Sequence, residues 1–137
     1  MDTMAPIRSA LQHPRRLLLN AVPPAAGEAR RQVQAYIYAW EVGVDPQIAA
    51  LLTSELVTNA IRHGAGEHVM LVMTSADGQL RVDVHDTSTC GPVPMEAPAD
   101  AETGRGLMLV DSLSADWGFY WTVAGKAVYF TLTIPGG

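Results

Sequence analysis

Two strand-like runs joined by a tight turn, at residues 68–76 and 79–86, limit the folds that this chain can adopt. The runs read "HVMLVMTSA" and "QLRVDVHD", and they meet at Asp77-Gly78, a pair typical of a two-residue β-hairpin turn. In the second run apolar residues alternate with polar ones, so one face of that strand is expected to be exposed to solvent. The segment therefore predicts an antiparallel hairpin with only one apolar face.

Two helices are predicted ahead of this hairpin. In residues 25–43 apolar residues recur at steps of three and four, which is the spacing of an amphipathic helix, and Gly43 closes the segment. Asp45 and Pro46 have the pattern of an N-cap followed by proline at the first helical position. They open a second helix over 46–63, which Gly64 ends.

The remaining predicted elements are a strand at 15–22, an irregular loop at 87–103, a helix at 104–118, and a hairpin of strands at 119–124 and 126–135 turning at Gly125-Lys126. Strands and helices segregate along the chain. We therefore expect an α+β two-layer sandwich, with a mixed, largely antiparallel sheet and helices packed on one face. Residues 1–14 show no periodicity and are predicted to be a flexible arm before a single domain at 15–137.

Composition excludes several classes of function. The chain has 137 residues, of which 48% are hydrophobic and 17% charged, which fits one globular domain. A net charge of −5 makes it a poor binder of nucleic-acid phosphates. The single cysteine, Cys90, allows no internal disulfide and favours the cytoplasm, and no apolar run approaches the roughly 20 residues that cross a bilayer. We expect a cytoplasmic protein that contacts neither nucleic acid nor membrane.

Three polar side chains interrupt the apolar 46–63 helix at intervals of four: Glu55, Asn59 and His63. Because each residue turns an α-helix by about 100°, these side chains lie almost in line along one border of the helix. The apolar stripe beside this line consists of Leu52, Leu56, Ala60 and Ile61. The line fits either a partly solvated helix edge, with His63 suited to the negative helix end, or the wall of a cavity.

Two further segments carry polar groups at element ends. Asp86 ends the strand 79–86, where its carboxylate either faces a site or forms a turn. "TGRGL" at 103–107 places Gly104 and Gly106 at the start of a predicted helix. Free N–H groups and the helix dipole at such a start can hold an anion, although glycine is common before helices.

In this order, "ELVTNAIRHG" with its polar line, "DTS" with Asp86, and "TGRGL" with its two glycines resemble the GHKL ATPase superfamily, which has the Bergerat fold. The likeness is strongest to the small bacterial anti-sigma regulatory factors, which are serine/threonine protein kinases of histidine-kinase-like fold. It spans roughly residues 15–135. The chain departs from the wider superfamily at Asp86-Thr87-Ser88, where Asp-x-Gly-x-Gly is usual, and its loop 87–103 is short for an ATP lid and rich in proline.

The resemblance implies ATP and Mg²⁺ as cofactors. Asn59 would coordinate the Mg²⁺ that bridges the phosphates, Glu55 would be the catalytic carboxylate that activates the attacking hydroxyl, and Asp86 would accept a hydrogen bond from the adenine amino group. The other implied nucleotide-binding residues are His63, Ser88, Gly104, Arg105, Gly106, Leu107 and Thr131. Of these, residues 104–106 would offer backbone N–H groups to the phosphates, and Thr131 would assist adenine recognition.

The implied partner is a STAS-domain anti-anti-sigma protein, phosphorylated on serine or threonine in a partner-switching pathway, with a sigma factor as a second partner and a homodimer as a further expectation. Two other functions stay open: a nucleotide-gated binding module without kinase turnover, and an interaction protein with a degenerate pocket. Val33, Ile37 and Trp40 would serve either a dimer interface or the monomer core. Lys126 either reaches a phosphate or lies solvated at a hairpin tip.

Overall fold

The computed structural model describes residues 14–64, 66–87 and 101–135, and of residues 101–106 it describes the backbone alone. The predicted N-terminal arm up to residue 13, Ser88, and most of the predicted loop at 87–103 lie outside the described residues. The predictions made for them therefore stay predictions.

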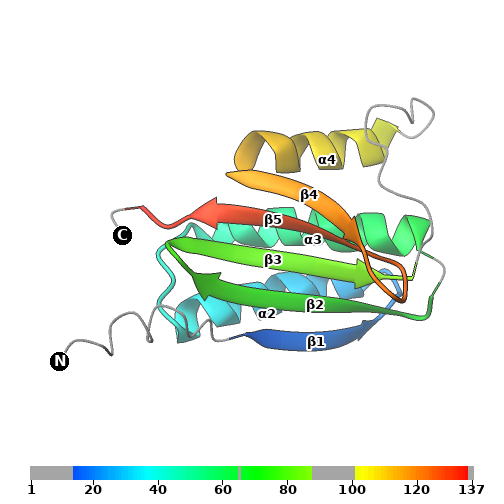
Figure 1. Cartoon of the computed structure of the whole chain (residues 1–137), viewed down its shortest axis with the longest axis horizontal. Coiled ribbons are helices and arrows are strands. Elements are labelled where there is room, and N and C mark those ends of the chain that lie inside the picture. Colours follow the sequence, from blue (N-terminus) through cyan, green and yellow to red (C-terminus); the bar gives the residue numbers. More distant parts are fainter. Residues whose placement is uncertain (1–13, 65, 88–100, 136–137) are drawn as a thin grey trace.

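Five strands form one open sheet in the order β1-β2-β3-β5-β4 (Figure 1). Their bounds are β1 Arg15–Asn20, β2 His68–Ala76, β3 Gln79–Asp86, β4 Asp116–Trp121 and β5 Lys126–Thr133. All four pairings are antiparallel, so the sheet described here is antiparallel throughout and not mixed. The β2–β3 turn has positive φ at Asp77 (55°) and Gly78 (75°), which confirms the predicted two-residue hairpin.

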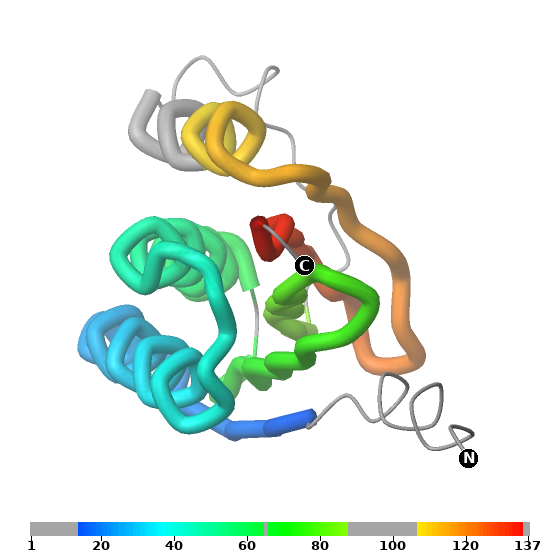
Figure 2. Tube along the Cα trace, turned by 90° about the vertical axis from the view of Figure 1, so that its left-hand side faces the viewer, coloured from blue at the N-terminus to red at the C-terminus, as the bar shows by residue number. Residues whose placement is uncertain are grey.

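In the described part of the chain the helices are α2 Ala25–Ala39, α3 Pro46–His63 and α4 Ala101–Leu113, and they lie along one side of the sheet (Figure 2). The predicted two-layer α+β architecture is therefore confirmed. The start of α3 has the predicted cap, because the Asp45 carboxylate accepts a hydrogen bond of 2.8 Å from the Gln47 N–H and Pro46 follows the cap.

Apolar side chains between the two layers form the core. Alternate residues of the central strands face the helices, as the period of two requires. The fully buried side chains on this face include Leu71, Met73, Leu80, Val82, Val84 and Phe130, and they pack with Val33 of α2 and Leu52, Leu56 and Val57 of α3. The alternate residues of the same strands form the other face of the sheet, which no helix of the described residues covers.

Two helices have boundaries that differ from the sequence predictions. Helix α2 ends at Ala39, four residues early, because Glu41 adopts a left-handed φ of 51° and the Val42 N–H reaches back to the Ile37 carbonyl at 2.9 Å. This is the hydrogen-bond pattern of a Schellman motif. Helix α4 begins at Ala101 and ends at Leu113, whereas a helix over 104–118 was predicted. The aromatic segment after it pairs with β5 as strand β4, with Trp117 opposite Phe130.

The apolar stripe of α2 is divided between core and surface. Val33 and Ile37 are buried in the monomer core, whereas the Trp40 side chain is 51% exposed. Two of the three residues considered for a dimer interface therefore stabilise the monomer. Dimerisation itself stays a prediction.

Candidate functional site

The predicted site segments lie toward the same end of the molecule. Helix α3 and strand β3 both end at the right-hand side of Figure 1, the side on which α4 begins. Helices α3 and α4 also pack against each other. Gly64 permits this approach, because a Cβ built at Gly64 would lie 3.4 Å from the Asp86 Cβ and only 2.5 Å from the Ala60 carbonyl oxygen. The fold thus places Asp86 directly beside the end of the helix that carries Asn59.

Asp86 forms a buried ion pair that the sequence did not reveal. Its Oδ2 accepts a hydrogen bond of 2.8 Å from the Lys126 ammonium, and the two side chains are 2% and 1% exposed. Asp86 and Lys126 are direct partners in the β3–β5 ladder and share the face toward the helices with Val84 and Val128. The expectation that Lys126 lies solvated at a hairpin tip is therefore wrong, because Lys126 opens β5 one residue after the turn and points inward.

Gly125 fixes the approach of this turn to the end of β3. A Cβ at Gly125 would collide with the Asp86 carbonyl oxygen and would lie 2.5 Å from the Thr87 Cα. These are backbone atoms of a paired strand, so they cannot move aside as a flexible side chain does. Glycine at this position therefore lets Lys126 begin its strand directly against Asp86.

Asn59 lies in α3 with a buried side chain, and its Oδ1 has no hydrogen-bond partner within the described part of the chain. A buried amide oxygen without a partner is unfavourable by about 1–3 kcal/mol, so a structure that retains one needs a reason. An amide oxygen is a hard ligand of the kind that Mg²⁺ accepts, and Mg²⁺ usually takes few protein ligands and completes its shell with phosphates and waters. The Asn59 oxygen therefore fits the predicted role as a Mg²⁺ ligand.

The other two members of the polar line differ in exposure. Glu55, one turn before Asn59, is half-buried, and His63, one turn after it, is exposed in the last turn of α3. Along this line the Asn59 side chain is therefore buried, whereas the His63 side chain faces solvent. The burial of Asn59 is not what an ordinary solvated helix edge would show.

The glycine segment does not have the predicted local structure. Because α4 already begins at Ala101, Gly104 to Gly106 lie inside the helix and not ahead of it. Only the first four N–H groups of a helix lack an intrahelical acceptor, so Arg105 and Gly106 do not offer free N–H groups to phosphates in this conformation. Leu107 is buried in the core.

Thr131 is separated from Asp86. It is five residues from Lys126 on β5 and pairs with Arg81, so it belongs to the opposite face of the sheet. Its hydroxyl is buried and has no hydrogen-bond partner within the described residues. The structure therefore does not bring Thr131 together with Asp86 and Asn59, and the predicted adenine role of Thr131 has no support from its position.

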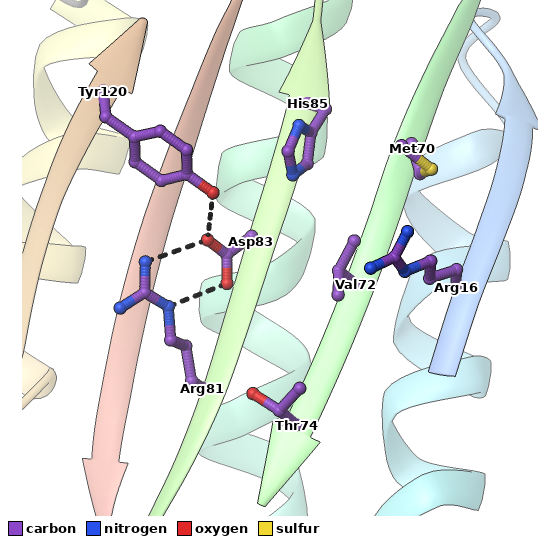
Figure 3. Close-up of a pocket in the computed structure, with 8 residues that line it drawn as sticks. All are labelled: Arg16, Met70, Val72, Thr74, Arg81, Asp83, His85 and Tyr120. Carbon is purple, nitrogen blue, oxygen red and sulfur yellow. Dashed lines mark hydrogen bonds and ion pairs between the residues drawn. The ribbon is translucent and has the colours of Figure 1, made fainter. Parts of the chain in front are cut away.

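The uncovered face of the sheet carries a second polar arrangement, around a cavity of about 430 Å³ (Figure 3). Arg81 donates two hydrogen bonds to the buried Asp83 carboxylate, Nε to Oδ1 at 2.9 Å and Nη2 to Oδ2 at 3.0 Å. The Tyr120 hydroxyl also donates to Asp83 Oδ2 at 2.8 Å, and the Arg81 guanidinium lies 4.1 Å from the centre of the Tyr129 ring. Arg81 and Asp83 are two residues apart on β3, so the sequence alone places them on the same face of that strand. Tyr120 lies on β4, and only the assembled sheet brings it to Asp83.

Two titratable groups of this cavity are held neutral at ordinary pH. Burial, together with the hydrogen bond to Asp83, raises the pKa of Tyr120 to about 12. Burial also lowers the pKa of His85 below its usual value. The Tyr120 hydroxyl therefore keeps its proton and continues to donate to Asp83, and we interpret this arrangement as a structural link between β3 and the edge strand β4.

Tyr120→Phe is expected to lower the free energy of unfolding by about 1 kcal/mol, because it removes one hydrogen bond to a buried carboxylate. Urea denaturation of both proteins measures the difference. Tyr38→Phe is the matched control, because Tyr38 is 69% exposed on α2. Equal losses in the two variants would contradict the structural role of the Tyr120 hydroxyl.

The described residues contain no group of three or more His, Cys, Asp or Glu side chains placed to hold a metal ion. Among the helices of these residues, none has the length and hydropathy needed to span a bilayer.

The fold and this site together define an α+β domain with an antiparallel sheet, three helices on one face and a polar edge at the end of α3. A family model described as "Histidine kinase-like ATPase domain" matches residues 19–132, and the chain belongs to that family. Among solved structures the chain is similar to the histidine kinase domain from the Erythrobacter litoralis EL346 blue-light activated histidine kinase. The two share 26% identity at a TM-score of 0.49, over 65% of this chain and 44% of the other. Comparison with curated proteins gives no match.

Proposed function

We propose that this protein binds ATP with Mg²⁺ and phosphorylates a serine or threonine of a STAS-domain anti-anti-sigma protein in a cytoplasmic partner-switching pathway. The observation that carries the nucleotide part is the unpartnered, buried Oδ1 of Asn59, in a chain of the histidine kinase-like ATPase family. Asp86, which pairs with Lys126 beside the end of the same helix, supports it. A sigma factor as second partner and a homodimer belong to the same proposal.

Each site residue has one chemical task in this proposal. Asn59 holds Mg²⁺ through its amide oxygen, and the metal, when bound, neutralises charge on the phosphates. Asp86 accepts a hydrogen bond from the adenine amino group, because an ionised carboxylate can only accept. Glu55 lies one turn before Asn59 on the same helix, so it can take the proton of an incoming hydroxyl near the phosphates.

The second candidate is a nucleotide-gated binding module without kinase turnover. It is favoured by exposed apolar side chains on α4, the helix that packs against α3 beside the site: Met108, Leu109 and Leu113. A change in α4 on nucleotide binding would alter an apolar surface that a partner protein contacts. The two candidates share the nucleotide site and differ in whether Glu55 is needed.

Asn59→Ala is expected to weaken Mg-ATP binding by about tenfold or more, because it removes a ligand that contacts a cation. Isothermal titration calorimetry of the full chain with Mg-ATP, and with ATP in excess EDTA, measures the loss and its dependence on the metal. The loss should be much smaller in EDTA. Asn20→Ala, at an exposed position of β1, is the control and should bind as the wild type does.

Two results would contradict the proposed site. A wild-type chain that binds no Mg-ATP at millimolar concentration would overturn the nucleotide proposal as a whole. Equal weakening of the Asn59 variant with and without Mg²⁺ would remove the metal role of Asn59 and leave the rest in place.

A further inference from the structure

The buried ion pair between Lys126 and Asp86 has a chemical consequence for the proposed nucleotide site. Lys126 is among the largest fully buried side chains of the described residues, and its ammonium lies 2.8 Å from Asp86 Oδ2. Removing two charges from water is costly, and a buried ion pair is often no more stabilising than apolar residues of the same volume. Stability alone is therefore a weak reason for this pair, and a role in ligand binding is the stronger one.

Lys126 determines which hydrogen bonds Asp86 can make. An ammonium donates hydrogen bonds and accepts none, so a carboxylate beside it is favoured in its ionised form. An ionised carboxylate only accepts hydrogen bonds. A carboxyl group buried without such a partner takes up a proton instead, and it can then also donate.

This difference matters for the purine that binds. At position 6 adenine carries an amino group, which donates, whereas hypoxanthine and guanine carry an oxygen, which accepts. An acceptor-only Asp86 bonds the amino group and repels the 6-oxo oxygen. A protonated Asp86 can donate to the 6-oxo oxygen and so loses the distinction.

We propose that Lys126 is a positioning residue that orients the Asp86 carboxylate as a hydrogen-bond acceptor, and thereby makes the site select adenine over 6-oxopurine nucleotides. The inference rests on the proposed nucleotide site. Its geometry comes from three neighbouring features: the Asp86–Lys126 strand pairing, Gly125, which brings the turn onto the end of β3, and Gly64, which brings α3 onto Asp86.

The test compares Mg-ATP with Mg-ITP, which differ at position 6 of the purine, by calorimetry on the wild type, Lys126→Met and Lys126→Arg. The wild type should bind ATP about tenfold or more tightly than ITP, because one charge-assisted hydrogen bond is lost and two acceptors face each other. In Lys126→Met the ratio of the two dissociation constants should fall toward one. Lys126→Arg keeps the positive charge and should retain most of the ratio.

A second variant keeps the test valid if Lys126→Met fails to fold. Arginine, like lysine, donates hydrogen bonds and accepts none, so Lys126→Arg leaves Asp86 beside a cation. A folded Lys126→Arg variant that binds ATP without any preference over ITP would overturn the role of Lys126.

The outcomes separate the two proposals. A wild type that binds neither nucleotide overturns both. A wild type that binds ATP but shows no preference over ITP overturns only the role of Lys126. A folded Lys126→Met variant that is less stable to heat but keeps the wild-type ratio also overturns it, because the lysine would then be structural only.

Discussion

Replacing Asp86 with alanine is expected to lower the free energy of unfolding by about 3–5 kcal/mol, because it leaves the Lys126 ammonium buried without its carboxylate. Water cannot screen the remaining charge, since the Lys126 side chain is 1% exposed. The chain can respond only by opening the β3–β5 end or by deprotonating the lysine, and both are unfavourable. Urea denaturation followed by far-ultraviolet circular dichroism measures the loss.

Two further variants assign this loss to the ion pair. Asp86→Ala combined with Lys126→Met should be more stable than Asp86→Ala alone, because no buried charge is then left unpaired. Glu28→Ala is the surface control: Glu28 pairs with Arg31 at 2.8 Å, but the Arg31 and Glu28 side chains are 70% and 41% exposed, so water screens the pair. If the double variant were as unstable as the single one, the unpaired ammonium would not be the cause.

Replacing Glu55 with alanine is expected to slow phosphoryl transfer by about 10²–10⁴-fold, the usual contribution of a general base. The affinity for Mg-ATP should change little, because the carboxylate is needed in the transition state and not for binding the nucleotide. The assay incubates each protein with radiolabelled ATP and with STAS-domain proteins from the same genome, and it measures the label transferred. Calorimetry on the same samples measures nucleotide affinity.

Two controls define what the Glu55 result means. Glu67→Ala, at an exposed position before β2, should transfer phosphate as the wild type does. A Glu55→Ala variant that also loses ATP would show that Glu55 supports the pocket and is not the base. If the wild type labels no STAS-domain protein, yet ATP changes its affinity for a partner, the binding-module function replaces the kinase function.

Local signals in the sequence were sufficient for several elements. The Asp45 cap and Pro46 located the start of α3 to the residue, because the cap is made by a side chain two residues from its donor. The Asp77-Gly78 turn located the β2–β3 hairpin for a similar reason, since its two residues themselves adopt the positive φ values that the turn requires.

The elements near the C-terminus were less predictable. The segment after Leu113 was assigned to a helix, but Trp117 pairs with Phe130 in a strand. Strand preference of aromatic residues depends on a neighbouring strand to pack against, and that neighbour follows later in the chain. The helix boundary was therefore decided by pairing between strands and not by local propensity.

The sequence by itself determined which residues share a face: the spacing of four aligned Glu55, Asn59 and His63, and the alternation of strand residues places Lys126 and Thr131 on opposite faces. Burial and partnership were decided only by the tertiary structure. The β3–β5 register brings Lys126 to Asp86 across forty positions of sequence, and the assembled fold buries Asn59. Local periodicity fixes the direction of a side chain from its own element, whereas its neighbours come from segments that only the assembled fold brings close.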